Sequence, residues 1–264
     1  MTNQANTRRT QATRPPYGVA CLLVVGLCAT GCAARRGAAE RPLTILDVYT
    51  ALDAERRAAI EGPTGGAERF ATLRARHPGD VYLRAREAEL LLAEDRDRAR
   101  ALLAVPEAEG SADARYVLGR IAATEGRLDE ARAHYEAAWR LAPDDPRPVE
   151  AAFTLGFAED GKRGSVARLR RAIADGASPT FDLVERGLGY ALDLRDEIAV
   201  AELAAHHART HPGRAWVLRA YARRQIPEAP DLALALLRPL PDGFEVVGEE
   251  LAALEAIRSR RRDR

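Results

Sequence analysis

The sequence contains few cysteines, and their placement excludes several kinds of chemistry. Three cysteines occur in 264 residues, and the last of them is Cys32. Disulfides, cysteine-ligated metals and cysteine nucleophiles are therefore excluded from residues 33–264. Any covalent role for a thiol belongs to the amino-terminal segment, where Cys21, Cys28 and Cys32 lie.

Aromatic residues and lysine are also scarce. Aromatic residues make up 5% of the chain, and Lys162 is the single lysine. Hydrophobic residues at 47% and charged residues at 30% indicate a folded chain, and the abundance of Ala, Leu, Arg and Glu favours helix. The formal net charge is +1, or −2 once residues 1–31 are removed. A charge so close to neutral gives no support to a nucleic-acid partner.

The amino terminus has the pattern of an export signal. Three arginines, Arg8, Arg9 and Arg14, precede an apolar stretch over residues 17–28, and small residues follow it. The next four residues, "ATGC" (29–32), resemble the lipobox of bacterial lipoproteins. That resemblance implies that Cys32 receives a diacylglycerol and becomes the first residue of the mature protein. Ala33, in place of an aspartate, implies delivery to the outer membrane with the body facing the periplasm.

Two other interpretations of this segment remain open. Residues 15–34 carry no charge over 20 positions and are long enough for an uncleaved transmembrane anchor. An ordinary cleaved signal peptide is the other alternative. On the lipoprotein interpretation, residues 1–31 are the signal peptide, residues 32–42 form a lipidated tether, and residues 43–264 form the body.

The body is predicted to be all-α. Helix-period segments follow one another from Leu43 almost to the carboxyl terminus. Clusters of Gly, Pro and Asp interrupt them at residues 61–66, 77–80, 142–146, 175–179 and 210–213. No stretch alternates with a period of two, so we expect no sheet.

Internal similarity gives the body a more specific interpretation. The stretch "YVLGRIAATEGRLDEARAHYEAAWRLAPDDP" (116–146) contains Leu118-Gly119, and similar pairs recur at Leu155-Gly156 and Leu188-Gly189. This pattern resembles the tetratricopeptide repeat, a helix–turn–helix of about 34 residues. In the clearest copy, Gly119 is expected to let a neighbouring helix approach closely and Gly126 to close the first helix. Ala131 and Ala138 are expected to lie one turn either side of Tyr135 on the second helix. The resemblance implies an α-solenoid of four to five repeats over residues 66–238. Flanking helices would cap both ends, and an insertion would lie in the copy around Gly156.

The resemblance also implies where a partner binds. In tetratricopeptide arrays the first helix of each repeat lines a concave groove that holds a protein or peptide. Carried over by spacing, the candidate groove residues are Tyr82, Tyr116, Arg120, Phe153, Phe157, Arg186 and Tyr190, with Glu89, Asp113, Asp160 and Asp193 among them. Aromatic residues and arginine often anchor interfaces. The alternative is a slip of one residue, which would place Phe153 and Phe157 in the core.

One cluster could support chemistry instead of binding. His206, His207 and His211 lie close together on a predicted helix, with Glu202 nearby, and could hold a metal ion. Their small neighbours favour the alternative that these histidines face solvent. No nucleophile elbow, HExxH motif or phosphate loop occurs in the sequence. We therefore expect a membrane-held interaction scaffold, with no enzymatic activity and no cofactor. At the level of architecture alone, it resembles lipoprotein assembly factors of outer-membrane β-barrel insertion and of type IV pili.

Overall fold

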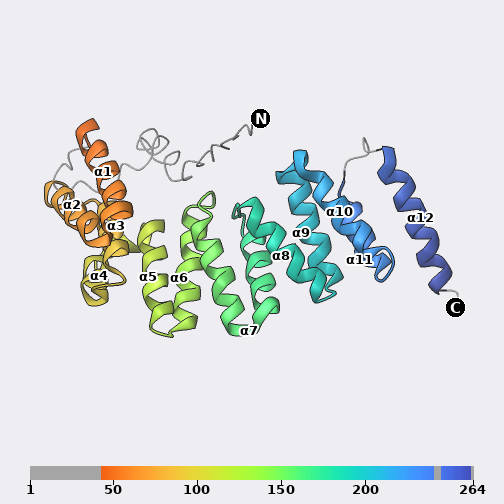
Figure 1. Cartoon of the computed structure of the whole chain (residues 1–264). Helices are drawn as coiled ribbons and strands as arrows, with labels where there is room; N and C mark the ends of the chain where they lie inside the picture. The colour runs from red at the N-terminus through yellow and green to blue at the C-terminus, as the bar shows by residue number, and fades with distance from the viewer. Residues whose placement is uncertain (1–42, 241–244, 263–264) are drawn as a thin grey trace, which may run out of the picture. The chain divides into compact units, whose positions relative to one another are not determined.

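The computed structural model describes residues 43–240 and 245–262, which form α-helices joined by short turns (Figure 1). The predicted signal peptide and tether, with Cys32, lie outside these residues. The twelve α-helices of the described ranges are α1 (Ile45–Glu61), α2 (Pro63–Arg76), α3 (Val81–Leu91), α4 (Arg96–Leu103), α5 (Ala112–Thr124), α6 (Leu128–Leu141), α7 (Arg147–Ala174), α8 (Phe181–Asp193), α9 (Glu197–Thr210), α10 (Ala215–Gln225), α11 (Pro230–Leu237) and α12 (Glu245–Arg262). Two short 3₁₀ helices, Pro106–Gly110 and Pro212–Arg214, lie between them. No strand occurs in the described part of the chain, and the all-α prediction is confirmed.

The helices pack as successive hairpins. Each helix contacts the next in chain order from α1 to α12. Corresponding helices of neighbouring hairpins also contact each other: the first helix α3 contacts the first helix α5, and the second helix α9 contacts the second helix α11. The body is thus an α-solenoid of tetratricopeptide-like helix–turn–helix units. Helix α1, expected as a flanking cap, instead forms a hairpin with α2.

The repeat length is set by the second helices of the hairpins. A small residue that is fully buried recurs every 34 residues, and a large buried residue follows it four positions later. The small residues are Ala131, Ser165, Ala199 and Ala233, and the large ones are Tyr135, Leu169, Leu203 and Leu237. Positions four apart lie on one face of a helix, so each pair packs against the same neighbours. This register corrects the one based on Leu-Gly pairs, whose separations were unequal.

The hairpin within α7 shows why the Leu-Gly register failed. Residues 147–174 form two helices that meet at a sharp turn, where Gly161 has a φ of 56°. The two helices touch through glycine: a β-carbon on Gly156 would lie 2.5 Å from the carbonyl oxygen of Gly164. Since Ser165 keeps the 34-residue spacing, the predicted insertion is wrong, and the turn is instead unusually tight.

The clearest sequence copy folds as its residues predicted. Gly126 closes the first helix of this unit with a φ of 74°, and Ala131 and Ala138 are fully buried. Gly119 lies against the ring of Tyr135, because a β-carbon on Gly119 would be 2.5 Å from Cε1 of that ring. The parallel expectation for Gly189 is wrong: no atom lies within 4 Å of its would-be β-carbon, and Gly187 makes the close contact instead.

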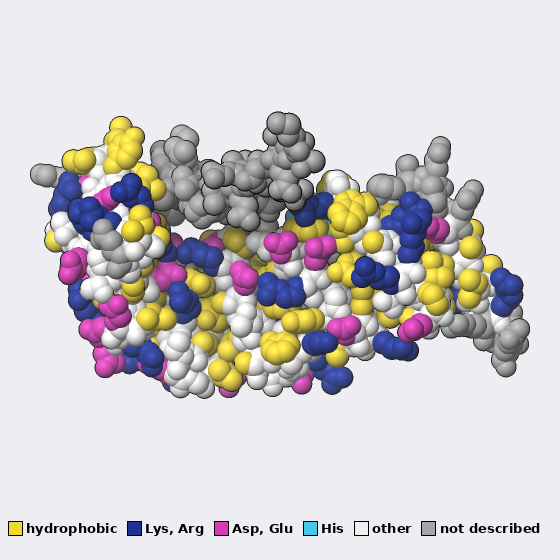
Figure 2. All heavy atoms as spheres, viewed as in Figure 1, with side chains coloured by type: hydrophobic (Ala, Val, Ile, Leu, Met, Phe, Trp, Pro, Cys, Tyr) yellow, Lys and Arg dark blue, Asp and Glu magenta, His cyan; other side chains and the backbone are white. Residues whose placement is uncertain are grey.

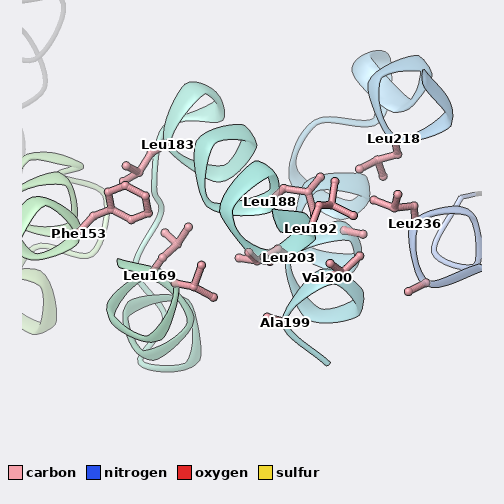
Figure 3. Packing of buried hydrophobic residues seen from close by; sticks show 14 of the residues in the cluster. Phe153, Leu169, Leu183, Leu188, Leu192, Ala199, Val200, Leu203, Leu218 and Leu236 are labelled. Atoms are coloured by element: carbon pink, nitrogen blue, oxygen red, sulfur yellow. The ribbon is translucent and has the colours of Figure 1, made fainter. Parts of the chain in front are cut away.

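A continuous hydrophobic core joins the later hairpins. Large apolar side chains from α7 to α11 point toward one another across the helix layers (Figure 3). Trp139 of α6 is fully buried in the same core, and its Nε1 donates a hydrogen bond to the Asp175 carboxylate at 3.3 Å. Because each hairpin is covered mainly by its neighbours, the stability of each unit depends on the adjacent ones.

Candidate partner-binding surface

The structure places the candidate groove residues on the first helices of the hairpins. Tyr82 lies on α3, Tyr116 and Arg120 on α5, Phe157 on α7, and Arg186 and Tyr190 on α8; we call this set the first-helix surface. Two groups of contacts divide it, one around Tyr116 and one around Tyr190. Tyr82 is half-buried against the core of the first hairpins, and this burial raises its pKa to about 12.

Arginines enclose the group around Tyr116. The guanidinium carbons of Arg147 and Arg120 lie 5.1 and 5.8 Å from the centre of the Tyr116 ring, which is cation–π distance. Arg120 donates a 2.8 Å hydrogen bond to Glu89, and Arg147 donates a 2.6 Å bond to Asp113. Burial raises the pKa of Tyr116, so its hydroxyl stays protonated at neutral pH. The cations on this part of the surface are already engaged by acids of the same chain.

These ion pairs connect one hairpin to the next. Arg86 of α3 pairs with Glu55 of α1 and with Glu89. Glu89 also accepts from Arg120 of α5, and Arg186 of α8 donates to Glu150 of α7 at 3.3 Å. The predicted groove arginines therefore brace adjacent first helices. Sequence spacing placed Arg120 and Arg186 on first helices, where they lie in the structure, but did not reveal these internal partners.

The group around Tyr190 is more open. The Phe157 side chain is 49% exposed, and its ring centre lies 5.9 Å from that of Tyr190. The ammonium of Lys162 lies 5.7 Å from the centre of the Tyr190 ring and 2.7 Å from the Asp193 carboxylate. An exposed aromatic ring next to a half-buried tyrosine and a lysine is a typical arrangement of a protein-binding patch.

Phe153 does not lie exposed beside Phe157. Phe153 is 2% exposed and stacks against Tyr190 with ring centres 5.6 Å apart and an interplanar angle of 17°. The guanidinium carbon of Arg186 lies over the Phe153 ring, 5.5 Å from its centre. The expectation that both phenylalanines face the groove is therefore wrong for Phe153. The two rings share one face of the helix and both contact Tyr190, but Phe153 lies in the core and Phe157, one turn later, lies at the surface.

A shallow pocket of about 540 Å³ adjoins Tyr190, between α8 and α10. Gly189 lies at its wall, with Tyr190 and Tyr221 on either side; Asp182, Glu185 and Arg224 also line it. Burial and the neighbouring Asp182 raise the pKa of Glu185. Gly189 has a helical backbone and no neighbour within 4 Å of its would-be β-carbon. Glycine inside a helix costs about 1 kcal/mol relative to alanine, and no close packing accounts for glycine at this position; a side chain here would extend into the pocket space.

The α10 side of this pocket was missed from the sequence. Tyr221, Arg224 and Gln225 belong to the half-matching copy at residues 214–238, which lacks a Leu-Gly pair, so no groove residues were carried over to it. The 34-residue recurrence of the second helices supplies the signal that was needed. It places Arg224 one repeat after Tyr190, and both residues line the same pocket.

The histidines of α9 do not face solvent, contrary to expectation. His206 and His207 are buried, and neither ring nitrogen of His207 has a hydrogen-bond partner among the described residues. The ring of Phe181 lies 5.2 Å from that of His207 and 5.3 Å from that of His211. This is aromatic packing at the junction of α8 and α9. Within the described ranges no group of three or more His, Cys, Asp or Glu residues could hold a metal ion.

The burial of His207 predicts a pH-dependent stability. Burial, with nearby His211, lowers the pKa of His207 from 6.5 to about 4. Between these values the unfolded chain binds a proton that the folded chain does not, so stability falls as pH falls from 6.5 to 4. The loss should amount to roughly 2–3 kcal/mol.

The measurement is urea unfolding of the wild type and His207→Leu at several pH values. Carboxylates contribute equally to both proteins, so the difference between the two curves isolates the histidine. The variant should gain stability relative to the wild type as the pH falls below 6.5. Parallel curves would show that His207 is protonated in the folded protein.

Comparisons with known proteins add little beyond the helical fold. No protein-family model matches the sequence, and no curated protein matches it. Among solved structures, a chain in the crystal structure of the APC/C hetero-tetramer Cut9-Hcn1 is similar with a TM-score of 0.44 and 13% identity, over 79% of this chain and 42% of that one. A chain in the structure of Naa15/Naa10 bound to HypK-THB is similar with a TM-score of 0.46 and 15% identity, over 83% and 35%. The chain spans less than half the length of either.

Proposed function

We propose that this protein is a lipoprotein of the outer membrane, anchored through Cys32, that holds a protein or peptide partner on its first-helix surface in the periplasm. The lipobox-like "ATGC" supports the anchor, and the tetratricopeptide-like architecture supports a scaffold role. In the described ranges no helix is both long and apolar enough to span a bilayer.

The observation that carries the binding role is the open group around Tyr190. Phe157 offers an exposed ring, and the adjoining pocket has open space where a side chain at position 189 would lie. The pocket combines two tyrosine rings with acidic and basic groups. That lining suits a partner side chain with an apolar body and a polar end, which buries its body while its end keeps hydrogen-bond partners.

The test uses a photo-crosslinking amino acid in place of Phe157 in cells, with the same group in place of Ile198 as the control. Ile198 of α9 is also a large apolar residue and is 65% exposed, but it lies on a second helix. We expect a discrete crosslinked partner from position 157 and none from position 198. Gly189→Trp should abolish that product, because the indole would fill the pocket.

One result would reject the binding role, and a second would restrict it to the exposed ring of Phe157. One is an equal pattern of products from positions 157 and 198, which would indicate random collision. The other is an unchanged product in Gly189→Trp, which would remove the pocket from the interface. The fold of the variant is checked by its melting temperature, which should not fall, because position 189 has open space around it.

A further inference from the structure

The first turns of α1 expose a dense group of large apolar side chains. Ile45 is 78% exposed, Leu46 and Tyr49 are each 66% exposed, and Leu43 and Val48 lie beside them in the sequence and are also exposed. Apolar side chains gather over this end of α1 in Figure 2. Soluble surfaces rarely carry so many large apolar residues in one place, and such patches mark contact with a partner or a membrane.

This apolar group is held in a fixed position. Thr44 and Asp47 form a capping box: the Asp47 carboxylate accepts hydrogen bonds from the Thr44 amide at 2.8 Å and the Thr44 hydroxyl at 2.6 Å. The Asp47 side chain is fully buried, and it also pairs with Arg76 at 2.8 Å and His77 at 3.2 Å, at the end of α2. The first turn of α1 is therefore pinned to the second helix, and the apolar side chains project from a braced helix rather than a frayed end.

We propose that this apolar side of α1 inserts into the interfacial region of the lipid bilayer that carries the Cys32 anchor. The proposal rests on the lipid anchor proposed above. Leu43 follows Cys32 by eleven residues, and a fully extended segment of that length spans at most about 40 Å. The start of α1 therefore cannot move far from the membrane surface.

The chemistry of the surrounding residues favours lipid as the occupant. The segment between Cys32 and Leu43 contains three arginines and one acid, a positive balance that attracts anionic headgroups. Ile45 and Leu46 are aliphatic, and Tyr49 combines an apolar ring with a polar hydroxyl, which suits the boundary between acyl chains and headgroups. An apolar helix face beside a lipid anchor would add to the membrane attachment and orient the first hairpin.

The experiment places a genetically encoded, solvent-sensitive fluorescent amino acid at position 45 or, as the control, at position 198. The intact, acylated protein is reconstituted into vesicles of phosphatidylethanolamine and phosphatidylglycerol, with and without nitroxide-labelled lipid. We expect blue-shifted emission and several-fold stronger quenching by the nitroxide lipid at position 45 than at position 198. Acylation is measured separately in cells by incorporation of labelled palmitate.

The outcomes separate the two proposals. Equal emission and quenching at the two positions in acylated protein would overturn insertion of α1 and leave the anchor intact. A blue shift at position 45 that depends on protein concentration in detergent, without lipid quenching, would assign the face to a second copy and overturn the proposal. Absent palmitate labelling would reject the anchor. In that case the non-acylated protein is mixed with the same vesicles. Quenching at position 45 would then support insertion of α1, and the absence of quenching would reject it.

Discussion

Phe153→Ala should lower the free energy of unfolding by about 3–5 kcal/mol, whereas Phe157→Ala should change it by no more than about 1 kcal/mol. The two residues are chemically identical and lie four positions apart on α7. Phe153 is buried in the continuous core, so its truncation leaves a cavity that the surrounding helices cannot fill. Phe157 is exposed, and its truncation removes only an edge contact with Tyr190.

Urea unfolding followed by circular dichroism measures both variants under the same conditions. The comparison is internally controlled, because both substitutions remove the same atoms from the same helix. Measured affinity for the partner identified by crosslinking supplies the opposite test, since Phe157→Ala should weaken binding by about 2 kcal/mol or more. Similar destabilisation by both substitutions would place Phe157 in the core and remove it from the first-helix surface.

Gly119→Leu should lower the free energy of unfolding by about 2–4 kcal/mol. Even a β-carbon at this position would lie 2.5 Å from Cε1 of the Tyr135 ring, and Tyr135 is itself buried. A leucine must therefore displace the ring or separate α5 from α6. Because the core is closely packed, neither movement is small.

Gly189→Leu is the matched control for Gly119→Leu. It introduces the same side chain into another first helix, at a position with no neighbour within 4 Å of the β-carbon. There the substitution should be neutral or stabilise the protein by up to about 1 kcal/mol, because leucine favours helix over glycine. Thermal melting of the two variants decides the matter. A larger loss in Gly189→Leu than in Gly119→Leu would invalidate the register of the repeats.

Much of the fold could be predicted from the sequence because its signals are local. Glycine, proline and aspartate clusters end the helices, and apolar residues recur with the helical period between them. In the clearest copy even individual roles were predicted correctly: Gly126 turns the chain, and Ala131 and Ala138 are buried beside Tyr135. These roles depend on neighbours within one hairpin, and one hairpin lies within one stretch of sequence.

The parts that were wrong depend on contacts between hairpins. Gly187 and Gly189 differ only in what packs against them, and the adjacent unit decides which one touches a neighbour. The pocket beside Tyr190 needs α10, whose unit lacks the Leu-Gly pair. Register errors of one or two residues at the sequence level exchange surface positions for core positions, as Phe153 shows.

The glycine contact inside α7 has a consequence for how this chain can change during evolution. At Gly119 a larger residue could be accommodated if Tyr135 became smaller, because the opposing atoms belong to a side chain. At Gly156 the opposing atoms are the backbone carbonyl of Gly164, and the reverse holds at Gly164. No second substitution can remove a backbone atom. Positions 119 and 135 are therefore free to covary among descendants of this sequence. Gly156 and Gly164 of α7, in contrast, must both persist for as long as the tight hairpin does.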